Sequence, residues 1–255
     1  MLLVVNINNT NTSLGVYEGE RLVKDWRVAT VPSRTVDEIG LLLCTLMSLG
    51  GVDREQIDAV AAASVVPPVV PTWEEAIRRY LGCAPLFVGP GVKTGVPIRY
   101  ENPKEVGADR IVNAVATIVR WGTPAIAIDF GTATTFDVIS AEGEYLGGVI
   151  CPGLGIAADA LFSRTAKLPR VELVRPAKAI GKTTVASIQA GLIFGTVGQV
   201  RELIRRISEE LGAKPRVIAT GGLAPVIAGD VPEIEAVDPY LTLEGLRLIW
   251  ERNRE

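Results

Sequence analysis

The sequence predicts an α/β protein made of two related halves, each built around a mixed β-sheet. The segment Val4–Thr12 returns, altered, as Ala127–Thr135, and each copy has an apolar run, a polar turn and a second apolar run. This pattern is typical of two antiparallel strands joined by a turn. A third strand and then alternating helices and strands follow in both copies, which is the layout of an α/β protein with mixed sheets. A duplication of this kind also favours an active site in a cleft between the two halves.

The first half is expected to cover residues 1–121. Thr35 with Glu38 and Thr72 with Glu75 have the spacing of a capping box, so each pair is expected to open a helix. The expected elements are strands at Leu2–Val5 and Leu14–Val16, a third strand after these, a helix from Thr35 to Gly51, a buried strand at Ile57–Val66, a helix from Thr72 to about Gly82, a short strand at Pro85–Val88, a loop at Gly89–Pro103 and a helix at Ala108–Arg120.

The second half is expected to cover residues 122–255, because Gly122-Thr123-Pro124 punctuates the chain just before the second copy. Its expected elements are strands at 125–130, 134–140 and 144–150, a helix from about Ile156, a long helix at Val185–Leu211, a strand at Arg216–Ala219 that feeds the turn Thr220-Gly221-Gly222, and a last helix at Leu243–Arg252.

Composition limits the class of protein. The 255 residues are 48% hydrophobic, which is enough for a buried core, and the net charge of −3 comes without a basic run. We therefore expect neither a nucleic acid nor a membrane as partner. The apolar start, Met1–Val5, is too short for a signal peptide, so a cytoplasmic location is expected. Cys44, Cys83 and Cys151 are far apart among apolar neighbours and are expected to be reduced core residues.

The chain contains no histidine. This absence removes the commonest general base and every Ser-His or Cys-His nucleophile pair. Acid–base chemistry must therefore come from carboxylates, lysine or tyrosine.

The two polar turns carry the clearest functional signal. They are rich in Gly, Asn and Thr and are longer than a two-residue hairpin needs, so N–H groups and hydroxyls can point outward toward phosphate. Gly107–Arg110, where a loop enters a helix, fits either a functional carboxylate or an ordinary helix start. Thr220–Gly222 fits either a close approach to an anionic or flat ligand or a tight strand–helix turn.

Two further glycine motifs do not fit their nucleotide-binding patterns. Gly181-Lys182-Thr183-Thr184 lacks the earlier glycine of a P-loop. Gly153–Ala158 imitates the dinucleotide fingerprint, but it follows antiparallel strands and Pro152, which is the wrong context for a βαβ unit.

Taken in order, the motifs resemble those of the type III pantothenate kinases, a branch of the actin-like superfamily with ribonuclease H-like halves that includes sugar kinases. The resemblance spans essentially the whole chain. It rests on Asn6–Thr12 with Leu14-Gly15, on Asn102-Pro103 with Val106–Arg110, on Asp129–Thr135, on Gly147-Gly148 with Pro152-Gly153, on Gly181 and Thr184 with Ser187, Gln189 and Gly191, and on Thr220–Gly222.

The resemblance implies ATP-dependent phosphorylation of the terminal hydroxyl of pantothenate to 4'-phosphopantothenate, the first step toward coenzyme A. It implies a homodimer, Mg²⁺ with the nucleotide, and a monovalent cation, K⁺ or NH₄⁺, held with the help of Asp129. Asp109 would be the general base. Residues facing ATP would be Asn6, Ile7, Asn8, Asn9, Thr10, Asn11, Thr12, Ser13, Thr132, Gly221 and Gly222. Residues of the pantothenate pocket would be Tyr100, Gly107, Ala108, Asp109, Arg110 and, from the partner subunit, Thr184.

The chain departs from the family pattern in its first turn. Asn6 stands where the pattern has aspartate, and Asn8 where it has glycine, whereas the second copy keeps Asp129 and Gly131. Asparagine lacks the negative charge that would hold a hydrated Mg²⁺. Two alternatives therefore stay open: a weakened, ligand-binding regulatory protein, and a kinase for another small hydroxylated metabolite.

Overall fold

The computed structural model describes residues 1–254, and their contacts divide the chain into two compact units. Unit 1 comprises Met1–Gly95, Asn102–Ala116 and the chain from Thr242 onward, and unit 2 comprises Val96–Glu101 and Thr117–Leu241. The expected division into residues 1–121 and 122–255 concerns the repeat in the sequence and stays a prediction. By contacts, the last helix is grouped with unit 1.

The sheet of unit 1 contains β1 (Leu2–Ile7), β2 (Asn11–Glu18), β3 (Arg21–Ala29), β4 (Ala59–Ser64) and β5 (Pro85–Phe87). Their order is β3-β2-β1-β4-β5. The pairs β1–β2 and β2–β3 are antiparallel, and the pairs β1–β4 and β4–β5 are parallel. The central strand β1 is buried along its whole length, as expected for a strand covered on both faces.

The sheet of unit 2 repeats this plan with β6 (Ala125–Phe130), β7 (Ala133–Ile139), β8 (Tyr145–Pro152), β9 (Arg216–Thr220) and β10 (Ala236–Val237). Its order, β10-β9-β6-β7-β8, is the order of unit 1 when it is followed from β8. The pairs β6–β7 and β7–β8 are antiparallel, whereas β6–β9 and β9–β10 are parallel. The predicted α/β fold with mixed sheets in two related copies is confirmed.

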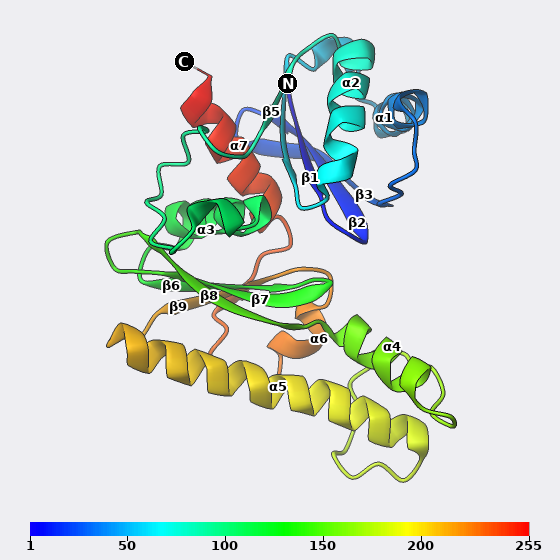
Figure 1. Ribbon diagram of the computed structural model, residues 1–255, viewed down its shortest axis with the longest axis vertical. Helices are drawn as coiled ribbons and strands as arrows, with labels where there is room; N and C mark the ends of the chain where they lie inside the picture. The colour runs from blue at the N-terminus through cyan, green and yellow to red at the C-terminus, as the bar shows by residue number, and fades with distance from the viewer. Residues whose placement is uncertain (255) are drawn as a thin grey trace. The chain divides into compact units, whose positions relative to one another are not determined.

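In unit 1, α1 (Val36–Gly50) and α2 (Val70–Leu81) cover one face of the sheet (Figure 1). Alternate residues of β1 point to that face. They pack there against the buried stripes of both helices, in a core that includes Leu3, Val5, Ile7, Ile39, Leu43, Met47, Trp73 and Ile77. The other residues of β1, among them Val4 and Asn6, therefore point to the opposite face.

The two expected capping boxes have different outcomes. Thr35 caps α1: its hydroxyl accepts from the Glu38 N–H, and the Glu38 carboxylate accepts from the Thr35 N–H at 2.7 Å. The prediction for Thr72 is wrong, because α2 begins at Val70 and its N-cap, Val69, makes no side-chain cap. Prolines at helix starts fix the backbone angle and need no N–H partner, and Pro67, Pro68 and Pro71 start the helical turn before Thr72.

We expect Thr35→Ala to lower the free energy of unfolding by about 1 kcal/mol, the usual cost of losing an N-cap. The matched variant Thr72→Ala replaces a residue inside α2 and should leave stability unchanged or slightly higher, because alanine favours helix. Urea denaturation of both variants measures the difference. Equal losses would contradict this assignment of the caps.

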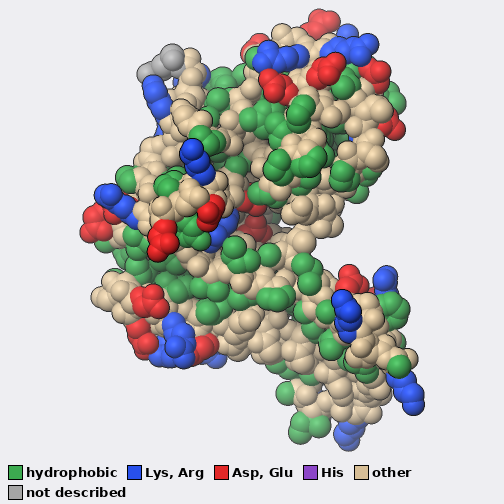
Figure 2. Space-filling view, viewed as in Figure 1, with side chains coloured by type: hydrophobic (Ala, Val, Ile, Leu, Met, Phe, Trp, Pro, Cys, Tyr) green, Lys and Arg blue, Asp and Glu red, His purple; other side chains and the backbone are tan. Residues whose placement is uncertain are grey.

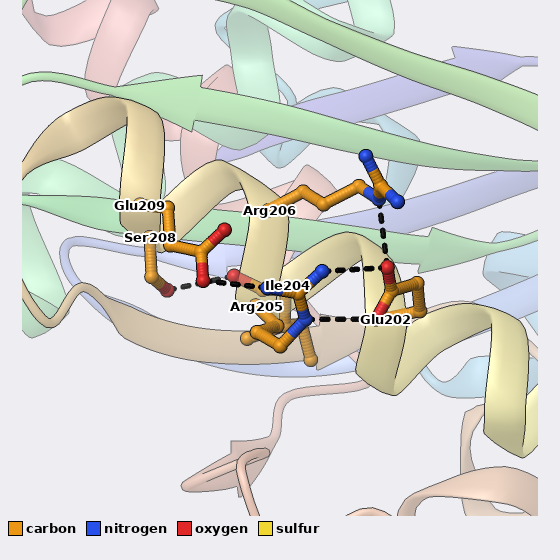
Figure 3. Close-up of polar contacts among 6 residues, drawn as sticks. All are labelled: Glu202, Ile204, Arg205, Arg206, Ser208 and Glu209. Atoms are coloured by element: carbon orange, nitrogen blue, oxygen red, sulfur yellow. Dashed lines mark hydrogen bonds and ion pairs between the residues drawn. The ribbon is translucent and has the colours of Figure 1, made fainter.

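The helices of unit 2 are α4 (Leu154–Arg164), α5 (Thr184–Leu211) and α6 (Ala224–Ala228). Of these, α5 packs along one face of the sheet (Figure 1). The core between α5 and the sheet includes Ile126, Ile128, Phe130, Phe136, Ile193, Val200 and Ile204. The exposed side of α5 carries a charge network in which Arg205 and Arg206 both pair with Glu202 (Figure 3). These bonds hold the pKa of Glu202 at about 2, although exposed pairs of this kind add little stability.

Two helices cross closely in unit 1: the part of α3 (Ala108–Trp121) up to Ala116, and α7 (Leu241–Asn253) from Thr242. A Cβ on the buried Gly245 of α7 would lie 2.1 Å from the carbonyl oxygen of Val112 on α3. Only glycine allows this approach. The start of α3 is therefore held in part by α7.

One strand, two short elements and the cysteines complete the comparison between the expected and the observed fold. The buried strand expected at Ile57–Val66 is shorter, because the 3₁₀ turn Arg54–Gln56 precedes it and Val66 already caps the next turn. The short elements α6 and β10 were not predicted. The three cysteines are free, as predicted, with Cys151 buried and Cys44 and Cys83 partly buried.

Acidic and basic side chains are mixed over α1 and α2 (Figure 2), where Arg78 pairs with Glu74 and Arg79 with Asp37. Within residues 1–254, no helix has both the length and the apolar character needed to cross a membrane.

Candidate active site

The first polar turn, called turn 1 here, joins β1 to β2 through Asn8–Thr10 in unit 1. The Asn8 N–H donates to the Asn11 carbonyl at 3.1 Å, and the hydroxyls of Thr12 and Thr30 are 2.9 Å apart. Asn6, next to the end of β1, is only 3% exposed. The Oδ1 atoms of Asn6 and Asn8 are buried and have no hydrogen-bond partner. Turn 1 is thus held by hydrogen bonds, but two acceptors at its start, one at the end of β1 and one in the turn, are unsatisfied.

The second polar turn, turn 2, joins β6 to β7 through Gly131-Thr132 in unit 2. The Gly131 N–H donates to the Ala133 carbonyl at 3.1 Å. Gly221, after β9, has φ +93°, and a Cβ there would lie 2.4 Å from Asp129 Oδ1. The structure therefore brings Asp129, turn 2 and the Thr220–Gly222 turn together, and glycine at 221 is needed for both its backbone angle and its closeness to the carboxylate.

The two turns differ in length by one residue. Ile7 pairs with Thr12, which leaves four residues, 8–11, between them, whereas Phe130 pairs with Thr134, which leaves three, 131–133. Thr12 therefore occupies the place of Thr134, and not that of Thr135 as the direct sequence match indicated. Turn 1 is not a superimposable copy of turn 2.

Asp109 lies in the first turn of α3. The Arg110 N–H donates to Asp109 Oδ1 at 2.8 Å and lies 3.1 Å from the Gly107 carbonyl. A Cβ on Gly107 would lie 2.7 Å from Asp109 Oδ1, so glycine leaves the space that this carboxylate occupies. Burial raises the pKa of Asp109 above its ordinary 3.8, and the Arg110 N–H and guanidinium oppose that rise. Arg110 itself is buried, with 8% of its surface exposed.

Turn 1 and Asp109 share one end of the unit 1 sheet. The Val65 N–H, just after β4, donates to the Ile7 carbonyl at 3.1 Å. The Cβ position of Gly107 lies 3.6 Å from Val65 Cγ1. Val65 thus contacts both the end of β1 and the Gly107–Arg110 segment. This segment therefore lies beside the carboxyl ends of β1 and β4, where turn 1 begins.

The remaining expected pocket residues lie in unit 2. The Tyr100 ring packs on Gly147 of β8, whose Cβ position is 3.2 Å from the ring, and the neighbouring Arg99 N–H donates to the Tyr145 carbonyl at 2.8 Å. Thr184 is exposed at the start of α5. It lines a cavity of about 1090 Å³ between α4, the 165–183 loop and α5, together with Arg164, Lys182 and Ser187.

The donor groups fit the two expected cations differently. Asp129, with Gly131 and Gly221 close to its Oδ1 atom, is the one carboxylate expected to help hold the monovalent cation. Among residues 1–254 no group of three or more Asp, Glu, Cys or His side chains could hold a metal ion. Mg²⁺ usually binds through one or two carboxylates plus substrate phosphates, and turn 1 offers amides in that place.

Gly153 is a site residue that the sequence-based assignment omitted. It caps α4 directly after β8, and a Cβ on it would lie 2.2 Å from the Thr132 carbonyl oxygen. The pairing of β8 with β7 brings it there. Its signal in the sequence was a Pro-Gly pair after a strand, which entered only the family pattern and the dinucleotide-like motif that was set aside.

The fold is shared with kinases of the actin-like class. A hexokinase of the ROK type from Thermus thermophilus matches with a TM-score of 0.53 and 13% identity, covering 97% of both chains. A protein from Campylobacter jejuni described as a conserved putative Baf family transcriptional activator matches with a TM-score of 0.64 and 17% identity, covering 99% of this chain and 98% of the other. At such identities the likeness shows the fold alone. The chain thus has the fold of the actin-like sugar kinases.

The particular family follows from sequence similarity. A family model for type III pantothenate kinase matches residues 2–206. The type III pantothenate kinase of Anaeromyxobacter dehalogenans (strain 2CP-C) is 58% identical over 254 residues and covers 100% of both chains. The chain belongs to the type III pantothenate kinase family, whose enzymes phosphorylate pantothenate in coenzyme A biosynthesis. The resemblance inferred from the motifs is confirmed, and so is the assignment as a kinase.

Proposed function

We propose that this enzyme transfers the γ-phosphoryl group of ATP to the terminal hydroxyl of pantothenate, with the Asp109 carboxylate as the base that receives the hydroxyl proton. The observation that supports this assignment is the placement of Asp109 at the end of the unit 1 sheet where turn 1 begins. Phosphoryl transfer needs mainly positioning and neutralisation of charge, so one oriented carboxylate suffices without histidine.

The polar turns are proposed to bind the nucleotide. In unit 1, Asn6–Ser13 supply N–H groups and hydroxyls for phosphate oxygens, and in unit 2, Thr132 with Gly221 and Gly222 does the same. Asp129 holds the monovalent cation. Mg²⁺, bound to the phosphates of ATP, neutralises their negative charge. Gly107, Ala108, Arg110 and Tyr100 bind pantothenate, with the Arg110 guanidinium suited to its carboxylate. A cytoplasmic location is part of this proposal.

The proposed role of turn 2 in nucleotide binding can be tested by a substitution at Gly153. We expect Gly153→Ala to raise KM for ATP by roughly tenfold or more, because the new Cβ meets the backbone of Thr132 and must displace turn 2. Gly155→Ala, at the second residue of α4, meets nothing within 4 Å and serves as the matched control. Steady-state kinetics with varied ATP measures the change. An unchanged KM for ATP in the folded Gly153 variant would remove turn 2 from the proposed nucleotide site.

The homodimer and the reach of Thr184 into the partner's site are proposed together. Thr184 is exposed and lines the cavity beside α4, so its side chain is accessible to a second subunit. We expect Asp109→Asn and Thr184→Ala each to be nearly inactive alone. Co-refolded in equal amounts, they should regain about a quarter of wild-type activity, because half the dimers are mixed and each has one intact site. Mixed dimers without recovered activity would show that Thr184 does not act across subunits.

A further inference from the structure

Asn6 and Asn8 form an unexplained pair of buried acceptors. Asn6 is 3% exposed, and the Oδ1 atoms of both side chains are buried without a hydrogen-bond partner. The residues are two positions apart where β1 ends, and side chains at that spacing on an extended chain leave the same face. A buried polar atom in a native protein is nearly always satisfied by protein, water, an ion or a ligand. These two oxygens therefore indicate that something binds between or beside them.

Turn 2 lacks this feature. There the corresponding residues are Asp129 and Gly131, and a Cβ at Gly131 would lie 3.4 Å from Asp129 Oδ1. Turn 2 thus offers a carboxylate and a glycine, whereas turn 1 offers two neutral oxygens and has one residue more between its paired strands. The two turns are built for different occupants.

The chemistry of the two oxygens selects the occupant. They accept hydrogen bonds or bind cations, and they carry no formal charge. Mg²⁺ gives up its water reluctantly and is usually held through carboxylates. Potassium ions, by contrast, exchange their water for neutral carbonyl oxygens, as in channel filters. Two buried amide oxygens on the same face of the chain therefore suit a weakly hydrated monovalent cation better than a divalent one.

We propose that the Oδ1 atoms of Asn6 and Asn8 bind a monovalent cation, K⁺ or NH₄⁺, at turn 1, at a site separate from the one assigned to Asp129. The inference rests on the proposed function in one respect: it takes a phosphate oxygen of bound ATP as a further ligand of the cation. A cation here supplies positive charge beside turn 1 that a carboxylate-bound metal would otherwise provide. The enzyme thereby keeps charge neutralisation at this turn although position 6 is an amide.

The site can be seen directly with heavier monovalent ions. We expect crystals of the full-length protein soaked in Rb⁺ or Tl⁺, without nucleotide or with a non-hydrolysable ATP analogue, to show anomalous density in direct contact with both Oδ1 atoms. Anomalous density at Asp129 alone, with turn 1 filled only by water, would overturn the proposal. So would a nucleotide complex in which the amide nitrogens face phosphate, because the orphaned atoms would then be donors.

Solution binding separates the two sites. In the Asp129→Asn background, KCl should still raise Tm relative to tetramethylammonium chloride at equal ionic strength. Adding Asn8→Ala, with Asn6 kept so that the strand stays intact, should raise the half-effective K⁺ concentration by roughly tenfold or more. No K⁺ effect in Asp129→Asn, or the same effect with and without Asn8, would sink the inference.

A converted turn supplies the complementary test. Asn6→Asp with Asn8→Gly copies the chemistry of turn 2, so we expect Mn²⁺ binding by electron paramagnetic resonance, without nucleotide, to become tighter than in wild type. Equal Mn²⁺ binding by both proteins would contradict a preference of turn 1 for monovalent ions. Phosphorylation of pantothenate is assayed on the same samples, so an active enzyme without a cation at turn 1 overturns this inference and leaves the proposed function standing.

Discussion

Asp109→Asn is expected to lower kcat for pantothenate phosphorylation by roughly 10²–10⁴-fold, the usual contribution of a general base. The amide keeps the size of the carboxylate and can still accept from the Arg110 N–H. It cannot take the hydroxyl proton. KM for ATP should change little, because the substitution leaves turns 1 and 2 intact.

The same variant should be more stable than wild type at neutral pH. Burial raises the pKa of Asp109, so ionising this carboxyl is less favourable in the folded state than in the unfolded chain. That unfavourable contribution is absent below the unfolded pKa, near the ordinary 3.8, grows as pH rises, and is complete above the folded pKa. The stability gain of Asp109→Asn should therefore vanish in acid and be full at neutral pH.

Wild-type activity should also fall in acid, since the base works only when ionised: kcat falls as pH falls through the raised pKa of Asp109. Steady-state kinetics and urea denaturation across pH measure both effects, with Asp159→Asn on the exposed surface of α4 as a control. An active Asp109→Asn enzyme would exclude Asp109 as the base. A variant that loses both activity and stability would point to a structural role.

Gly245→Ala is expected to lower the free energy of unfolding by about 1–3 kcal/mol, the range for inserting a methyl group into a packed contact. The new Cβ would lie 2.1 Å from the Val112 carbonyl oxygen and 2.7 Å from Val112 Cγ1, so α7 and α3 must move apart. Because α3 begins with the Asp109 segment, kcat should also fall.

A matched substitution separates this contact from the general effect of alanine in a helix. Gly198 lies on α5 with nothing within 4 Å of its Cβ position, so Gly198→Ala should raise stability by up to about 1 kcal/mol. Urea denaturation and kinetics on both variants supply the comparison. If Gly245→Ala gained stability as Gly198→Ala does, the close crossing of α3 and α7 would be wrong.

Local signals predicted much of the fold. Thr35 and Glu38 marked the start of α1 correctly because a capping box depends only on residues three apart. Thr72 failed although its spacing was the same, since the preceding prolines had already fixed the backbone. The repeated apolar and polar runs predicted both hairpins. The direct match of the repeats nevertheless misaligned the second strands by one residue, because hydrogen-bond register and not residue type sets the length of each turn.

The sequence alone determined the family, the duplicated α/β plan and the residue types available for catalysis, because order and spacing along the chain are sufficient for these. Only the tertiary structure decided which of those residues meet: Gly153 with the Thr132 backbone, Gly221 with Asp129, Gly245 with Val112, and Asp109 with the sheet end where turn 1 begins. It also revealed the two unsatisfied amide oxygens of turn 1. Such contacts join residues distant in the chain, and whether a polar atom is buried or satisfied depends on what packs around it.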